Sequence, residues 1–132
     1  MMTNNFDKTV TSHFKIVFPT ALNDNETLFG GEALKWMDEV AYITAIRYTK
    51  MKVVTVSTDK IQFLKPITTG SIVEIVGKVL KVGTVKMDIL VEIYMEELKT
   101  DQRQKVITGV FTFAAVNEKN KPVAIVCKLQ HF

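Results

Sequence analysis

The chain has 132 residues, which is enough for one domain with a buried core over residues 1–132 but leaves no room for a second. Its hydrophobic content of 47% and charged content of 23% are typical of a folded globular protein. The net charge of +3 fits an anionic small-molecule ligand, and the sequence has no Lys/Arg run or nucleic-acid motif, which argues against a nucleic-acid partner.

Cysteine and histidine usage argues against a disulfide-rich or metal-binding protein. The single cysteine, Cys127, cannot form an internal disulfide, which is typical of a reducing compartment. His13 and His131 lack metal-ligand spacing to other side chains, so we predict no metal. No signal peptide is expected, and no apolar run approaches the roughly 20 residues of a membrane span. We therefore expect a cytoplasmic protein without a membrane partner.

The first half of the chain predicts one strand and one helix. Residues 1–8 are polar and expected to be frayed, and the alternating pattern of residues 10–18 predicts a half-buried strand. Residues 23–49 begin as a turn rich in Asn and Asp and pass through Gly30-Gly31. They continue as about five turns of helix-forming sequence, at roughly 3.6 residues per turn. This is the only helix that the sequence predicts.

The predicted helix is apolar around most of its circumference, so we expect other structure to surround it. Asp38 interrupts the apolar pattern, and Glu39 lies about 100° away around the helix, so the two carboxylates cannot share one environment. If Asp38 faces the surrounding layer, it must be hydrogen-bonded or used in function. The alternatives are that Asp38 is solvated, or is paired with Lys35 three residues earlier. The spacing leaves these alternatives open.

The second half of the chain has the alternating pattern of strands. We predict strands at residues 53–56 and 59–64, separated by a bulge, then at 71–82, 84–98, 104–117 and, as a short edge strand, 123–126. Turn residues join successive segments, the tightest turn being Val82-Gly83-Thr84. Strands joined by short turns are antiparallel. The expected fold class is α+β, with one long central helix and a curved antiparallel sheet of about five strands wrapped around it.

Several stretches of the sequence resemble a known family. They are N-D-N-E-T-L-F-G-G-E-A-L-K-W-M-D-E-V-A from residue 23, V-V-T-V from residue 53, F-L-K-P-I-T-T-G from residue 63 and K-V-G-T-V-K-M from residue 81. Together they resemble the acyl-CoA thioesterases of the hotdog superfamily, in the group of bacterial short hydrolases and duplicated brain-type and cytosolic enzymes. The resemblance implies a hotdog fold, hydrolysis of acyl-CoA to fatty acid and CoA without a separate cofactor, and a homo-oligomer built as a trimer of dimers.

The resemblance also implies which residues act in catalysis. The catalytic asparagine of the family corresponds to Asn23, its helix aspartate to Asp38, and its threonine on the strand after the helix to Thr55. Some relatives carry an aspartate just before the Leu/Ile-Phe-Gly-Gly string, where this chain has Thr27. This difference shifts the expected carboxylate chemistry onto Asp38.

These residues suit thioester hydrolysis, which needs an attacking group and donors for the oxyanion. Gly30 and Gly31 open the helix, so unpaired N–H groups and the positive dipole end face outward, and glycine lets an acyl chain approach the backbone. We predict that the Gly31 N–H and the Asn23 side-chain amide form the oxyanion site. Asp38 is expected to act as general base or as a nucleophile that forms a transient anhydride, with Thr55 orienting the water or the carboxylate.

Helix geometry predicts that the site lies between two subunits. Gly31 and Asp38 are seven residues apart, on nearly one face of the helix but about 10 Å apart along its axis. One helix therefore cannot bring both to the same carbonyl group. Two antiparallel helices can place Gly31 of one opposite Asp38 of the other, so the minimal active unit is predicted to be a dimer.

The phosphates of coenzyme A predict basic contacts at the mouth of the site. The candidate substrate-binding residues are Lys65, Lys81 and the hairpin residues Gly83 and Thr84. For each lysine, an ordinary solvated side chain is the alternative.

Two other functions fit the same expected fold. A hydratase or dehydratase acting on acyl-CoA or acyl carrier protein would place a histidine against the acidic residue, and the predicted helix and its approach contain none. A module that binds acyl-CoA without cleaving it is the second alternative. Release of free thiol from an acyl-CoA would separate a thioesterase from such a module.

Overall fold

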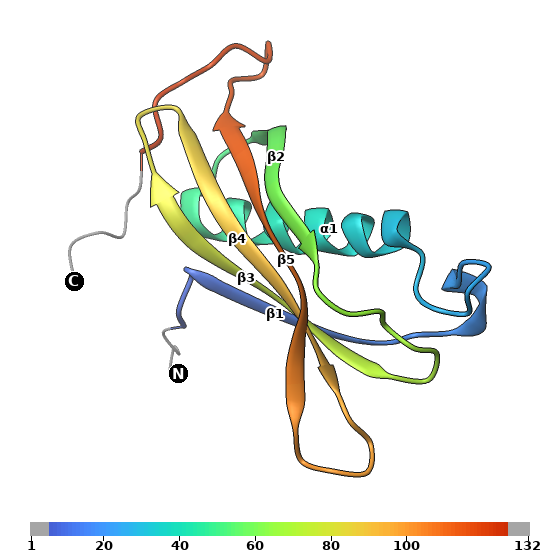
Figure 1. Cartoon of the computed structure of the whole chain (residues 1–132). Coiled ribbons are helices and arrows are strands. Elements are labelled where there is room, and N and C mark those ends of the chain that lie inside the picture. Colours follow the sequence, from blue (N-terminus) through green and yellow to red (C-terminus); the bar gives the residue numbers. More distant parts are fainter. Residues whose placement is uncertain (1–5, 127–132) are drawn as a thin grey trace.

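The computed structural model describes residues 6–126 (Figure 1). Predictions that concern residues 1–5, Cys127 and His131 lie outside this range. The elements in chain order are β1 (Val10–Ile16), the 3₁₀ turn η1 (Pro19–Ala21), α1 (Gly30–Thr49), β2 (Val53–Phe63), β3 (Ile72–Val82), β4 (Lys86–Glu96) and β5 (Arg103–Ala115). Within this part of the chain, no helix combines the length and the apolar character needed to cross a membrane.

The strands form one antiparallel sheet in the order β1-β3-β4-β5-β2. In a single chain β1 and β2 are therefore the two edges of the sheet. The sheet is strongly twisted, and α1 lies across one of its faces (Figure 1). The predicted α+β class, with one long helix and five antiparallel strands, is confirmed over the described residues.

The bounds of the elements agree closely with those predicted from the sequence. The helix begins at Gly30 and ends at Thr49, where Lys50 adopts a left-handed conformation with φ 56° and closes the last turn. The predicted bulge in the strand after the helix is present, because the register of β2 against β5 shifts between Thr55 and Ser57.

The predicted edge strand at residues 123–126 is wrong. An isolated bridge joins Val116 and Pro122, and the N–H groups of Val123 and Ile125 donate to the Ala115 and Thr84 carbonyl oxygens, but residues 123–126 form no strand. Proline has no N–H to donate, so the ladder cannot continue through it. The segment therefore runs on as irregular chain.

The core lies between α1 and the inner face of the sheet. Met37, near the middle of the helix, is completely buried, and so are Phe111 and Phe113 of β5. Full burial of a side chain of this size stabilises the fold by about 1.5–3 kcal/mol. The buried helix residues are Ala33, Trp36, Met37, Val40, Ala41, Thr44, Ala45 and Thr49.

The outer side of α1 is exposed in the single chain, although the apolar pattern predicted that other structure would surround the helix. Lys35 and Glu39 are exposed there, together with Tyr42 and Ile43, which are 42% and 44% exposed. One sheet offers one face to the helix, so about half of the helix circumference remains uncovered.

Two glycines set how closely the elements approach. A Cβ atom at Gly77 of β3 would lie 2.6 Å from the Thr44 hydroxyl oxygen of α1, and one at Gly109 of β5 would lie 2.3 Å from the Ile61 Cδ1 atom of β2. A side chain at either position would force its neighbour away. The helix therefore rests directly on the backbone of β3 at Gly77.

The opposite face of the sheet carries a charged network centred on Glu92. This residue is 8% exposed and accepts hydrogen bonds from Lys105 Nζ at 2.9 Å and from the Tyr94 hydroxyl at 3.0 Å. Burial by itself raises the pKa of Glu92, but the bonds from Lys105 and Tyr94 outweigh burial and hold the pKa below its ordinary value of 4.5. The Arg103 guanidinium lies 4.0 Å from the centre of the Tyr94 ring.

We expect Lys105→Met to lower the free energy of unfolding at neutral pH, because the Glu92 carboxylate loses a charged donor. The pKa of Glu92 is lowered in the folded state, so the stabilisation is present above the unfolded pKa and is lost as the pH falls through the folded value. Urea titrations should therefore show a deficit that shrinks below pH 4.5. Lys119→Met, in an exposed turn, serves as the control. A deficit that stays constant down to about pH 3 would contradict this expectation.

Candidate active site

A short, tightly closed loop between η1 and α1 holds Asn23. The Asn23 N–H donates to the Thr27 carbonyl oxygen at 2.8 Å, and the Glu26 N–H donates to the Asn23 carbonyl oxygen at 3.1 Å. Glu26 has φ 60°, in the left-handed region that a non-glycine residue seldom adopts. This conformation reverses the chain, so that Thr27 returns to the side of Asn23.

Hydrogen bonds determine the orientation of the Asn23 side chain. Its Oδ1 atom accepts from the Asn25 N–H at 2.9 Å and from the Thr27 N–H at 3.1 Å. Its Nδ2 atom lies 3.0 Å from the Thr27 hydroxyl oxygen and donates to it. Backbone N–H groups can only donate, so they require the oxygen, and not the nitrogen, on their side of the carboxamide.

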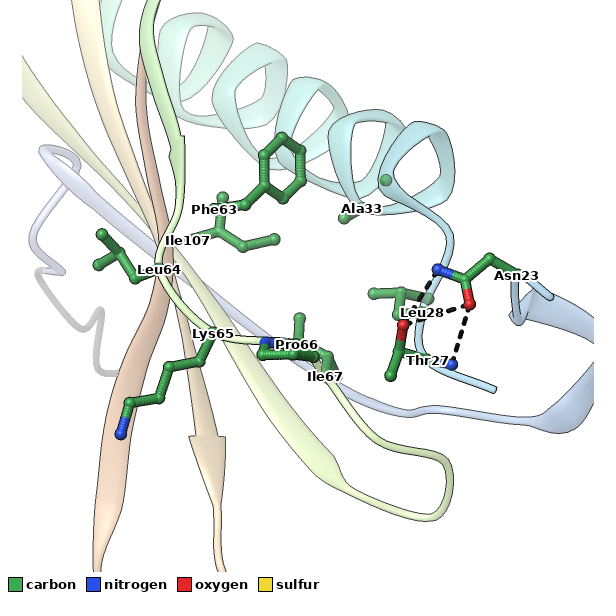
Figure 2. Close-up of a pocket in the computed structure, with 11 residues that line it drawn as sticks. Asn23, Thr27, Leu28, Ala33, Phe63, Leu64, Lys65, Pro66, Ile67 and Ile107 are labelled. Atoms are coloured by element: carbon green, nitrogen blue, oxygen red, sulfur yellow. Dashed lines mark hydrogen bonds between the residues drawn. The ribbon is translucent and has the colours of Figure 1, made fainter. Parts of the chain in front are cut away.

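Asn23 and Thr27 stand at one side of a pocket of about 370 Å³ (Figure 2). Its inner wall is apolar and comes from the start of the helix, the loop after β2 and β5. The Phe63 ring stands at the pocket close to the first turn of the helix, and it is 54% exposed (Figure 2). The lining residues are Asn23, Thr27, Leu28, Gly30, Ala33, Phe63, Leu64, Lys65, Pro66, Ile67 and Ile107.

The pocket includes the N-terminus of α1. The first N–H groups of a helix have no partner within the helix. Here Phe29, which precedes the helix, makes no side-chain cap for them either. A Cβ atom at Gly30 would lie 3.5 Å from the Phe63 ring, in contact with it, so glycine leaves room beside the backbone here. Of the two predicted oxyanion donors, Asn23 lines this pocket, whereas Gly31 does not; Gly30, the residue before it, does.

Asp38 and Thr55 form a second group of predicted residues. Asp38 is partly buried while Glu39 is exposed, and the Thr55 hydroxyl on β2 donates to Asp38 Oδ1 at 3.3 Å. In the described part of the chain Asp38 forms no ion pair with Lys35. Of the alternatives left open by the sequence, pairing with Lys35 is not seen, and the partly buried Asp38 bonds to Thr55 at the edge of the sheet.

A single chain does not bring the two groups together. Neither Asp38 nor Thr55 lines the pocket that holds Asn23. Asp38 lies seven residues beyond Gly31 in one continuous helix, which is about 10 Å along the axis. Within one chain the two groups are therefore separate, and a site shared between two chains stays a prediction.

The predicted contacts for coenzyme A are also divided. Lys65 lines the pocket, but its Nζ atom points away from Asn23 (Figure 2) and donates to Gln104 Oε1 at 2.6 Å. Lys65 is therefore a rim residue of the pocket.

The hairpin between β3 and β4, which follows Lys81 and contains Gly83 and Thr84, lies on the side of the molecule where α1 ends (Figure 1). The Thr84 carbonyl oxygen accepts from the Ile125 N–H at 2.7 Å. The Val126 N–H donates to the sulfur of Met51, which lies just after the C-terminus of the helix. These three residues stay predictions as substrate contacts, because one chain places them far from the Asn23 pocket.

Sequence reasoning missed two residues of the pocket. The sequence predicts no role for the Thr27 hydroxyl and shows only that threonine stands where some relatives carry an aspartate. The available signal is the pair Asn and Thr four residues apart in a turn, which favours side-chain bonds to the loop. Phe63 was assigned to a strand, and no periodic signal shows that its ring reaches the helix start. Only the pairing of β2 with β5 places it there.

The arrangement supplies the groups that acyl transfer to water needs. N–H donors at the Asn23 pocket can bind a developing oxyanion, and the Asp38 carboxylate with the Thr55 hydroxyl can position and deprotonate water. Among residues 6–126, no three His, Cys, Asp or Glu side chains gather closely enough to hold a metal ion.

Comparison with known families agrees with this chemistry. Residues 25–101, more than half of the chain, match the family model described as the thioesterase superfamily. The chain belongs to the thioesterase superfamily. Bacillus subtilis YkhA, which is named an uncharacterized acyl-CoA thioester hydrolase, is 38% identical to it over 109 residues. The match covers 83% of this chain and 63% of YkhA, so this superfamily member spans less than two thirds of that relative.

Solved structures of superfamily members have the same fold. An acyl-CoA hydrolase from Staphylococcus aureus, described in complex with butyryl coenzyme A and coenzyme A, is 33% identical with a TM-score of 0.86. The match covers 91% of this chain and 73% of that one. A hexameric thioesterase from Yersinia pestis is 30% identical with a TM-score of 0.80, covering 86% and 93% of the two chains. The chain therefore has the hotdog fold of these thioesterases.

The Staphylococcus aureus enzyme has also been solved with an asparagine, an aspartate or a threonine replaced by alanine. In that enzyme the asparagine and the aspartate are 15 positions apart, and the aspartate and the threonine are 17 apart. Asn23, Asp38 and Thr55 have the same residue types, order and spacings. The predicted catalytic residues thus correspond in type and spacing to the positions replaced in that relative.

We expect Asn23→Ala to lower the free energy of unfolding by about 1 kcal/mol, because the N–H groups of Asn25 and Thr27 lose their acceptor. Asn25→Ala changes an exposed side chain of the same loop and should stay within about 0.5 kcal/mol of the parent. Urea titration of both variants measures the difference. Equal stabilities would show that the Asn23 bonds do not hold the loop.

Proposed function

We propose that this protein hydrolyses acyl-CoA thioesters to a carboxylic acid and free coenzyme A. The observation that carries the proposal is the set Asn23, Asp38 and Thr55, which has the residue types and spacings of the positions replaced in the Staphylococcus aureus acyl-CoA hydrolase. The physical arrangement supports it, because Thr55 donates to Asp38 and Asn23 lies in an apolar pocket at the helix start.

In this proposal the thioester carbonyl lies against the start of α1. The Gly31 N–H and the second hydrogen of Asn23 Nδ2 donate to the oxygen as it becomes negative, which is the largest single contribution in many acyl-transfer enzymes. Asp38 takes the proton of the attacking water, or attacks the carbonyl itself and forms an anhydride that water then cleaves. Thr55 holds the carboxylate in position through its hydroxyl. Coenzyme A leaves as the thiolate and takes up the proton that water gave to Asp38, or a proton from solvent, to become the thiol.

The proposed active unit is a dimer, and the exposed edge of β2 supports it. Within the described chain β2 pairs only with β5, while Val54, Val56 and Phe63 are 37%, 44% and 54% exposed. An unpaired strand edge with apolar side chains is a template for pairing with another chain. Pairing of two β2 edges about a two-fold axis would place Thr55, and the Asp38 carboxylate bonded to it, at the contact between chains.

The same arrangement gives roles to the residues at the far end of α1. Two antiparallel helices bring the C-terminal end of one beside the N-terminal end of the other. Lys81, Gly83 and Thr84 of one chain are then positioned to contact coenzyme A held in the pocket of its partner, with Lys65 on the rim of that pocket. We further propose a trimer of dimers, in line with the hexamer described for the Yersinia pestis thioesterase.

We expect Asp38→Ala to reduce kcat for butyryl-CoA by at least about 100-fold, because the general base or nucleophile is removed. Glu39→Ala removes the neighbouring exposed carboxylate and should leave kcat within about twofold of the parent. Detection of the released thiol measures both variants. Binding of butyryl-CoA without thiol release by the parent protein, across acyl chains of different length, would refute the proposed hydrolysis.

Subunit mixing tests the shared site. Asn23→Ala and Asp38→Ala subunits, each strongly weakened alone, should recover about a quarter of parental activity after unfolding together and reassembly in equal amounts, because half of the dimers are mixed and each mixed dimer keeps one intact site. Each variant reassembled alone is the control. Mixed protein as inactive as the controls, with reassembly verified by size, would place both residues in one chain's site.

A further inference from the structure

We propose that Thr27 is a positioning residue, whose hydroxyl holds the Asn23 carboxamide so that one Nδ2 hydrogen points into the pocket. The inference rests on the proposed thioester hydrolysis and assigns a role to the position where some relatives carry an aspartate. It begins from the bonds that Asn23 makes within its loop (Figure 2).

The carboxamide of Asn23 is held at both ends. Oδ1 accepts from two backbone N–H groups, and Nδ2 donates one of its two hydrogens to the Thr27 hydroxyl at 3.0 Å. The same hydroxyl lies 3.2 Å from Oδ1, to which it can also donate. Among residues 6–126 no further acceptor for Nδ2 is found, and Asn23 lines the pocket. The second hydrogen is therefore available to a carbonyl oxygen bound there.

Thr27 itself is fixed by its backbone, so its hydroxyl has a defined position. Thr27 forms an antiparallel bridge with Thr68, and the following N–H, that of Leu28, donates to the Ile67 carbonyl oxygen at 2.7 Å. Its own carbonyl oxygen accepts from the Asn23 N–H at 2.8 Å. These backbone bonds do not involve the hydroxyl, so a change confined to the side chain leaves the loop closed.

Replacement by valine isolates the role of the hydroxyl. Thr27→Val keeps the branched shape and every backbone bond but removes the partner of Nδ2, so the carboxamide is held only through Oδ1. A donor that is not held in place stabilises the transition state less. Thr27→Val should therefore lower kcat more than it weakens substrate binding. Serine at this position retains the hydroxyl and should preserve turnover.

The first test is steady-state kinetics with butyryl-CoA. We expect Thr27→Val to lower kcat about tenfold with KM within about twofold, less than the about 100-fold or greater loss expected when the Asn23 donor itself is removed. Thr27→Ser should stay within about threefold of the parent. Thr68→Val is the matched control, because its hydroxyl bonds to Ser71 outside the pocket. An unchanged kcat in Thr27→Val, or equal losses in the valine and serine variants, would overturn the inference.

A double-mutant cycle tests whether Thr27 acts through Asn23. If it does, Thr27→Val should have no further effect on kcat when Asn23 is already alanine. A tenfold effect that persists in the Asn23→Ala protein would refute a positioning role. A crystal structure of Thr27→Val separates this inference from the proposed function. A carboxamide that takes up more than one orientation supports positioning even if no acyl-CoA is hydrolysed, whereas an unchanged carboxamide overturns it.

Discussion

The straight α1 helix imposes the constraint on which the rest of the molecule depends. It begins at Gly30 beside the Asn23 pocket and carries Asp38 seven residues after Gly31, so two chemically complementary groups are held about 10 Å apart. A movement of the whole helix cannot change this distance, because both residues belong to the same helix. A site that uses both groups therefore needs a second helix, which is the reason for proposing a dimer as the active unit.

The sheet explains how that second helix can be supplied. Its strand order leaves β2 at an edge, and β2 is the strand that carries Thr55, the partner of Asp38. An edge strand is the natural place for two copies to join. In the proposed dimer the Asp38 carboxylate would lie next to the contact between chains, while Asn23 lies in a pocket that a single chain forms.

Much of the fold could be predicted, because hydrophobic periodicity and turn residues report local structure directly. The helix from Gly30 to Thr49, the five strands and the bulge after Thr55 all followed from pattern. The prediction of a strand at residues 123–126 was wrong because the apolar residues there continue a strand pattern, while Pro122 lacks the N–H donor that pairing needs. The open side of α1 could not be predicted, because periodicity shows that a helix face is apolar without showing which molecule covers it.

The sequence by itself determined the chemistry available to this protein, because the residue types and spacings of Asn23, Asp38 and Thr55 are properties of the linear chain. Tertiary structure alone decided how these residues are grouped. Asp38 turns toward Thr55 because β2 returns beside the helix, and the Asn23 amide is oriented because a left-handed Glu26 folds Thr27 back onto it. Each of these contacts forms only because the chain reverses direction between the two residues. A hydrophobic pattern carries no information about where such a reversal places a polar side chain.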